Sequence, residues 1–371
     1  MANGAPDDAV GASGDPSMGA AAAAGDDAAP PPAEAVPGPL RVRHTLTGHT
    51  RAVAAVKLCP VDSGLLASAS ADQTVRLWRI GGGGSSGGGA DADAAGPREA
   101  SPAGGLQHGS GANDVAWGPL GNHLASVADD GAARLWDAET GACLRVMPGH
   151  TNYAYCCQFD PAGSLLATGS FDETLRFWDV RCGRLLRETP AHSDPVTCLS
   201  YSFDGTLLAS GSFDGLVRVW DARNGHCLRS YASSAASAPV NDVALAPNAQ
   251  YYLQATLDHR LRLVHLETGR CAKTYAGHRN EDFCCGATFA AAAGGGAGGG
   301  GGAAVASGSE DGSLCVWGLN TRKLLQRELG AAAGGASHGG AVLCVTAHPS
   351  LPLVVTGGQD ADCAIKVWAA A

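Results

Sequence analysis

The chain has 371 residues, of which 45% are hydrophobic, and its 25 basic against 35 acidic residues give a formal net charge of −10. This acidic balance argues against a protein that coats nucleic acid or an anionic membrane. No run of 18 apolar residues occurs, and the first ten residues contain no basic side chain, so we expect neither a membrane-spanning helix nor a secretory leader.

Low-complexity segments interrupt the chain. Residues 1–38 are mostly Ala, Gly, Pro and Asp, with six acids and no Lys or Arg. Such a segment has too little apolar area to offset the entropy of ordering, so it is predicted to be a disordered acidic tail. Three further Gly- and Ala-rich segments, at 81–107, 290–304 and 330–340, predict flexible inserts.

The remainder of 39–371 repeats a unit whose third strand is apolar and ends in Trp. The Trp position is filled by Trp78, Trp136, Trp178, Trp220, Val264, Trp317 and Trp368, with spacings of 58, 42, 42, 44, 53 and 51 residues, and the longest spacings contain inserts. Within each unit, short alternating strands separated by turn residues predict an antiparallel meander. Seven such sheets closed into a ring bury both faces and protect their edges. The sequence therefore predicts an all-β fold, a seven-bladed β-propeller forming a single closed domain.

Two strands of this ring need separate treatment. The apolar segment 40–46 is predicted to supply the outer strand of the last blade, because only Ala follows Trp368. The outer strand of the first blade is not recognisable in residues 98–106, where an insert replaces it.

An Asp stands six residues before each Trp position, and a His about 28 residues before most of them. His49, Ser70 and Asp72 resemble a catalytic triad in composition, but a catalytic site occurs once and this set recurs, so we interpret it as a structural network that links strands. In the fifth unit Ala236 replaces the His, and Ser or Thr lies two residues before the Asp in most units. The predicted structural residues are His49, Asp72, Trp78, His108, Asp130, Trp136, His150, Asp172, Trp178, His192, Asp214, Trp220, His278, Asp311, Trp317, His338, Asp362 and Trp368.

The thirteen cysteines include no CxxC pair. Neighbours on a strand point to opposite faces, so neither Cys156–Cys157 nor Cys284–Cys285 suits one metal ion. We expect reduced, buried cysteines in an intracellular protein. No phosphate-binding loop or hydrolase motif occurs, so no metal, cofactor or catalytic residue is predicted.

Functional residues of a propeller are expected around its central channel. Counting five residues on from each His, or six in blade six, gives Ala54, Asn113, Tyr155, Thr197, Asn241, Cys284 and Leu343 as the inner ring, and nearby turns add Ala71, Asp129, Phe171, Phe213 and Phe283. Aromatic rings and a carboxylate around a narrow pore form a socket for a cationic side chain such as arginine. Packing of these rings within the core is the competing interpretation.

The chain resembles the WD-repeat family over 40–371. More narrowly, LTGHTRAVAAVK (46–57), AHSDPV (191–196), GSFDGLVRVWD (211–221) and TYAGHRNEDFC (274–284) are similar to the WD-repeat core subunits of COMPASS (trithorax-type) histone H3 lysine methyltransferase complexes. The resemblance implies a channel that accepts an arginine of the methyltransferase subunit or the histone tail, at Ala71, Gly111, Asn113, Asp129, Tyr155, Thr197, Phe213, Asn241, Phe283, Cys284 and Leu343. It implies two aromatic rings around the arginine, of which only Tyr155 is present because the second position is Gly286, a loss of up to about 30-fold in affinity.

The resemblance also implies a second groove on the opposite face for another subunit, at Asn248, Tyr251, Leu263, Lys273 and Asn320. The expected function is then a non-enzymatic scaffold, a monomer within a nuclear hetero-complex, with the cytoplasm left open as a further location. Two alternatives stay open: an adaptor of a ubiquitin ligase or RNA-processing assembly, and a propeller enzyme.

Overall fold

The computed structural model describes residues 39–80, 98–100, 106–234, 237–291, 303–329 and 337–370. These residues belong to one compact unit that spans Ala35–Ala371. The predicted tail at 1–38 lies outside the described residues. In the described ranges, no helix has the length and hydropathy needed to cross a membrane.

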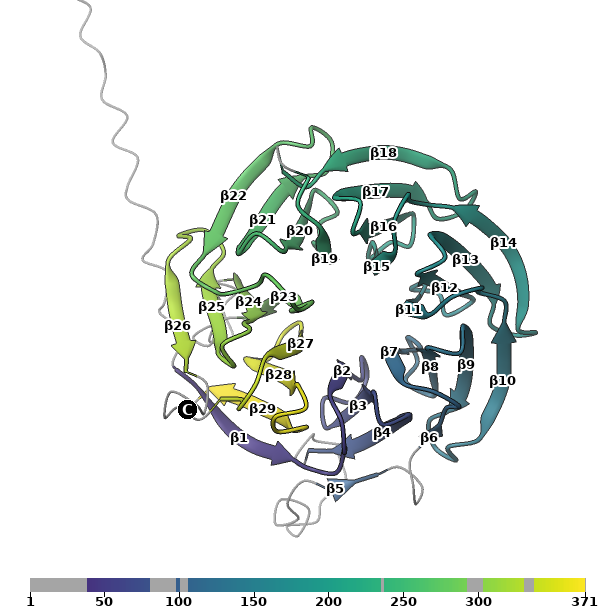
Figure 1. The fold of residues 1–371 in the computed structure, drawn as a ribbon, viewed down its shortest axis with the longest axis horizontal. Helices are drawn as coiled ribbons and strands as arrows, with labels where there is room; N and C mark the ends of the chain where they lie inside the picture. The colour runs from purple at the N-terminus through teal and green to yellow at the C-terminus, as the bar shows by residue number, and fades with distance from the viewer. Residues whose placement is uncertain are drawn as a thin grey trace, which may run out of the picture. The chain divides into compact units, whose positions relative to one another are not determined.

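The unit is a ring of seven antiparallel sheets, as predicted (Figure 1). Blades one to three contain β2 Val53–Leu58, β3 Leu65–Ser70, β4 Thr74–Arg79, β5 Arg98–Glu99 and β6 Leu106–Gln107; β7 Ala112–Trp117, β8 His123–Ala128, β9 Ala132–Asp137 and β10 Cys143–Pro148; and β11 Ala154–Phe159, β12 Leu165–Ser170, β13 Thr174–Asp179 and β14 Arg184–Pro190. Blades four and five contain β15 Val196–Tyr201, β16 Leu207–Ser212, β17 Leu216–Asp221 and β18 Cys227–Ala232; and β19 Val240–Leu245, β20 Tyr251–Thr256, β21 Arg260–His265 and β22 Cys271–Ala276. Blades six and seven contain β23 Ala287–Ala291, β24 Ala303–Gly308, β25 Leu314–Gly318 and β26 Leu324–Glu328; and β27 Val342–Ala347, β28 Leu353–Gly358, β29 Ile365–Ala370 and β1 Leu40–Leu46.

The ring closes through β1, which confirms the prediction for residues 40–46. This strand pairs antiparallel with β29, with Leu46 opposite Ile365 and Leu40 opposite Ala370. The inner strand β2 of blade one also packs against β27 of blade seven. Figure 1 shows the purple β1 lying outside the yellow β29, so both ends of the ring contribute to one sheet.

The core lies between blades, because each sheet buries both of its faces. One apolar cluster joins Leu46, Val53 and Trp78 to Val355 and Ile365 across the closure. Each Trp that ends a third strand is buried in such a cluster. The repeat therefore places a Trp ring at six of the seven blade interfaces, and Val264 takes this place between blades four and five.

Blade one has an outer strand after all, which corrects the sequence analysis. It is split in two: Glu99 pairs with Trp78 in β5, and Leu106 pairs with Val75 in β6. Leu106 is only 1% exposed and Glu99 forms an ion pair with Arg76 at 3.0 Å. One apolar anchor and one charge pair hold these short strands in place, and such isolated residues leave no alternating pattern in the sequence.

The other two inserts are shorter than predicted at their edges. Ala290 and Ala291 continue β23, and Ala303 and Ala304 begin β24. The remainder of this insert, 292–302, lies outside the described residues, as do 330–336 of the last one. His338, assigned to that insert by its boundaries, is fully buried and belongs to the structural network of blade seven.

Candidate functional site

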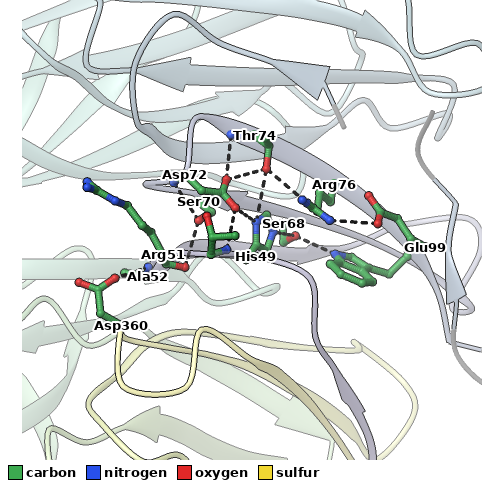
Figure 2. A network of polar contacts seen from close by, with 12 residues as sticks. His49, Arg51, Ala52, Ser68, Ser70, Asp72, Thr74, Arg76, Glu99 and Asp360 are labelled. Atoms are coloured by element: carbon green, nitrogen blue, oxygen red, sulfur yellow. Dashed lines mark hydrogen bonds and ion pairs between the residues drawn. The ribbon is translucent and has the colours of Figure 1, made fainter. Parts of the chain in front are cut away.

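The recurring His, Asp and Trp form a buried hydrogen-bond network, shown for blade one in Figure 2. His49 donates from Nδ1 to the Asp72 carboxylate at 2.8 Å, and its Nε2 is hydrogen-bonded to the Ser68 hydroxyl at 2.7 Å. The Trp78 indole donates to the same Ser68 oxygen at 2.8 Å. Burial acts to raise the pKa of Asp72, but hydrogen bonds from His49 and Thr74 outweigh it and hold this pKa far below its usual range.

The hydroxyl in this network differs from the predicted one. It belongs to the residue four positions before the Asp, whereas Ser70, two positions before it, accepts the amide of Asp72 and donates to the carbonyl of Arg51. The same arrangement recurs in blades three and four through Thr168 and Ser210, and in blade seven through Thr356, which stands six positions before Asp362. In these four blades the hydroxyl is buried and hydrogen-bonded to a Trp. It therefore stabilises its sheet and is not accessible to a substrate.

Blade two departs from the predicted network. Arg134 lies between His108 and Asp130, and it donates to His108 Nδ1 at 2.5 Å and to the Asp130 carboxylate at 2.7 Å. His108 still contacts Ser126, which also accepts from Trp136. Burial, together with the Arg134 charge, lowers the pKa of His108 to about 4, so this ring stays neutral.

Blade six forms no such network, which corrects the roles assigned to His278, Asp311 and Trp317. Neither ring nitrogen of His278 has a hydrogen-bond partner in the part of the chain that the structure describes, and Trp317 donates to the carbonyl of Ala276. Asp311 instead binds Ser313 and Arg327. Burial lowers the pKa of His278 to about 4.

Blade five keeps only the Asp of the repeat. Asp258 pairs with Arg262, and both contact Thr256. Gln254 replaces the bridging hydroxyl and donates to the carbonyl of Ser233. Ala236 lies outside the described residues.

The inner ring of the channel is produced by β-bulges. In six blades the register of the inner strand skips one residue, and these residues are Ala54, Asn113, Tyr155, Thr197, Asn241 and Leu343. A bulge redirects the side chain that it leaves unpaired. Six of the predicted inner-ring positions therefore coincide with bulges, and in blade six Cys284 precedes β23.

The channel contains a cavity of 380 Å³, within the range of small-ligand pockets. Of the eleven predicted socket residues, seven line it: Asn113, Tyr155, Thr197, Asn241, Phe283, Cys284 and Leu343. Burial raises the pKa of Cys284 to about 11, and it also raises the pKa of the neighbouring Tyr155 hydroxyl. Both groups are therefore neutral at physiological pH.

The four other predicted socket residues are not among those that line the cavity. A Cβ placed at Gly111 would stand 3.0 Å from Oδ2 of Asp129 and 3.5 Å from Cα of Ala71, so these three are neighbours. Asn113 connects them to the cavity, since its amide donates to Asp129 at 2.8 Å. Phe213 packs against Phe171, whose ring lies 5.3 Å from that of Tyr155.

Sequence reasoning missed four charged residues of the cavity wall: Lys57, Asp114, Asp242 and Asp282. Of the three acidic residues, Asp114 and Asp242 lie on inner strands. Burial raises the pKa of both carboxyl groups, and Lys57 partly opposes this increase. Each Asp follows the bulge of its strand and accepts an amide of the next blade, from Cys157 and Ala287 respectively. The position of Asp114 and Asp242 was the available signal: each directly follows a predicted inner-ring residue, and the bulge brings both residues to the cavity.

The residues predicted for the second groove belong to blades five and six. Lys273 donates to the carbonyl of Leu319 and to the side chain of Asn320 at 2.8 Å. Tyr251 packs edge-on against His265, and Leu263 is buried in the apolar cluster beneath. Asn248 caps the turn before Tyr251 by accepting the amide of Gln250.

All thirteen cysteines are free, and seven are buried. Cys143, Cys182, Cys227 and Cys271 are exposed, which corrects the expectation of burial. Three of them begin outer strands, which face solvent. Among the described residues, no group of three or more His, Cys, Asp or Glu side chains is placed to hold a metal ion.

Comparison with known proteins agrees with this geometry. Residues 45–369 match the family model of the WDR5 beta-propeller domain. The chain belongs to this WD-repeat propeller family. Members of the WD-repeat propeller class are typically non-catalytic scaffolds that bind peptide partners in protein complexes.

Several curated proteins are similar to parts of this WD-repeat propeller. Protein Mut11 of Chlamydomonas reinhardtii is 47% identical over 27% of this chain and 32% of its own length. Pre-mRNA-processing factor 17 of Mus musculus is 30% identical over 33% of this chain and 18% of its own length. The probable coatomer subunit beta' of Schizosaccharomyces pombe is 32% identical over 29% of this chain and 12% of its own length. The matches cover a third or less of each relative.

Proposed function

We propose that this propeller is a non-catalytic scaffold that binds an arginine-bearing peptide in its channel and supports assembly of a histone H3 lysine methyltransferase complex in the nucleus. The observation that carries the proposal is the 380 Å³ cavity on the ring axis, lined by Tyr155 and Phe283. A rigid ring loses little conformational entropy on binding, so a short peptide is a suitable guest.

The charge of the cavity wall favours a cation. The lining residues include one ammonium, Lys57, and three carboxylates, Asp114, Asp242 and Asp282. Tyr155 offers an aromatic face, and a guanidinium both stacks on such a face and donates several hydrogen bonds. This combination supports arginine as the guest side chain.

The channel is tested by titrating a peptide that contains Ala-Arg, and the same peptide with citrulline in place of arginine. We expect micromolar binding of the arginine peptide, weaker binding by Asp129→Ala, and a loss of about 2- to 30-fold in Tyr155→Ala from the cation–π contribution. Tyr153→Ala is the matched control, because Tyr153 also packs on Phe171 but does not line the cavity. No binding by the wild type at high micromolar concentration would refute the socket.

The assembly role is tested by affinity purification from nuclear extract. Co-purification of SET-domain and SPRY-type subunits, reduced by Tyr155→Ala, is the expected result. Recovery of RNA-processing or ubiquitin-ligase subunits in their place would refute the methyltransferase assignment and favour a different WD-repeat adaptor.

A further inference from the structure

Blade five places two neighbouring polar side chains in the wall of the cavity. The bulge between Val240 and Asp242 allows both Asn241 and Asp242 to line it, although adjacent strand residues normally face opposite ways. Of the inner-ring pairs, only Asn113–Asp114 of blade two has the same residue types. The two pairs differ in burial, because Asn241 is buried whereas Asn113 is only half-buried.

Asn241 has a buried acceptor without a donor. Its side-chain nitrogen donates to the carbonyl of Cys285 at 3.0 Å, whereas its oxygen has no hydrogen-bond partner among the described residues, and Asn241 is only 5% exposed. Buried polar atoms are nearly always paired, so an unpaired acceptor in a residue that lines a cavity indicates a missing N–H donor. In Asn113 of blade two, by contrast, the amide nitrogen binds both Asp129 and Ala154.

Asp242 keeps acceptor capacity beside this atom. Its two oxygens accept the amides of Val243 at 2.9 Å and Ala287 at 2.8 Å, which leaves about two of its four acceptor positions unused. A Cβ at Gly286 would lie only 3.5 Å from Asp242 Oδ2. Glycine at 286, which also lines the cavity, therefore leaves this carboxylate uncovered.

The surrounding charges leave this carboxylate without full compensation. Lys57 is the cation that acts on both Asp114 and Asp242, and the ammonium forms no ion pair with any described residue. The lining residues carry three carboxyl groups, those of Asp114, Asp242 and Asp282, against the ammonium of Lys57. A positively charged guest side chain complements this excess of acidic groups.

We propose that Asn241 and Asp242 form the acceptor side of the channel and select a guanidinium over an ammonium or a neutral side chain. The guanidinium donates to Asn241 Oδ1 and pairs with the Asp242 carboxylate while Tyr155 contacts it from another blade. Its planar array of five donors reaches two neighbouring acceptors at once, whereas an ammonium is a compact, strongly hydrated charge. This inference rests on the proposed arginine-binding function.

The test measures the affinities of three peptides that carry arginine, lysine or citrulline at one position. Asp242→Asn is expected to weaken the arginine peptide at least 10-fold and to leave the citrulline peptide within threefold. Asn241→Ala leaves the backbone contacts of Asp242 intact and is expected to reduce the preference for arginine over lysine at least fivefold. Asp137→Asn is the matched control, because Asp137 also accepts two amides, from Glu139 and Thr140, but does not line the cavity.

Folding of each variant is checked by its urea midpoint. If the wild type binds the arginine peptide and Asp242→Asn and Asn241→Ala keep the wild-type preferences, this inference is wrong while the channel function stands. Equal weakening of the arginine and citrulline peptides, or an equal change in Asp137→Asn, also overturns it, because a purely structural role has that result. If the wild type binds none of the peptides, both proposals fail.

Discussion

Replacing Ser68 by Ala in blade one tests whether the hydroxyl bridge holds the sheet together. The Ser68 oxygen is fully buried and contacts both His49 and Trp78. Its removal leaves one buried acceptor and one buried donor unpaired, each destabilising by about 1–3 kcal/mol. After partial relaxation, we expect the free energy of unfolding to fall by about 2–4 kcal/mol.

Ser307→Ala in blade six is the matched control for this substitution. Ser307 has the same position relative to the repeat Asp and is equally buried, but it donates only to the carbonyl of Gly308. Its loss is expected to destabilise by about 1 kcal/mol or less. Urea unfolding compares the two midpoints at unchanged m-value. Equal losses in the two variants would refute the bridging role of Ser68.

Three further outcomes are expected. His108 and His278 have pKa values of about 4 in the folded protein against 6.5 ordinarily, so between these values the unfolded chain binds more protons and the free energy of unfolding falls as the pH drops from 6.5 toward 4. The urea midpoint of the double His108→Gln, His278→Gln variant should therefore depend less on pH in this window. A pH dependence equal to that of the wild type would contradict this prediction. Leu46→Asp places a charge in the apolar cluster at the ring closure and should open the ring, which small-angle scattering detects as an increased radius of gyration. Arg41 lies on the same strand but is exposed, so Arg41→Asp should leave the radius of gyration unchanged. Replacing 292–302 by Asn-Gly shortens the loop between paired strands and should stabilise by roughly 1.5 kcal/mol in urea unfolding, and destabilisation would show that the insert makes contacts.

The fold was predictable because its periodicity is physical. A buried Trp at six of the seven blade interfaces and an Asp six residues before each Trp position mark the repeat, whose interval is about 42 residues where no insert lies. The closure by 40–46 followed from the same count, since one blade lacked an outer strand. The split strand of blade one was not predictable, because Glu99 and Leu106 are held by single contacts and two-residue strands carry no alternation.

Only the bulged inner-ring residues of the candidate site could be predicted from the sequence. Counting from the His identified the bulge residues, such as Tyr155, because the bulge has the same place in each of six strands. The count did not identify Asp114 and Asp242, because strand alternation places the following residue on the other face, and only the bulge brings both into the cavity. It also chose Ser70 over Ser68, since both hydroxyls share a strand face and only coordinates show which one reaches the indole.

The pairing of β1 with β29 has a consequence for synthesis of the chain. Leu46 and its partner Ile365 are about 320 residues apart, so at ribosomal rates of roughly 5–20 residues per second the first strand waits about 16–64 s for its neighbour. During that interval an apolar strand has an unpaired edge, and the blades already made form an open arc. Nascent chains of this protein are therefore most vulnerable to aggregation, and most dependent on chaperones, until the last strand emerges.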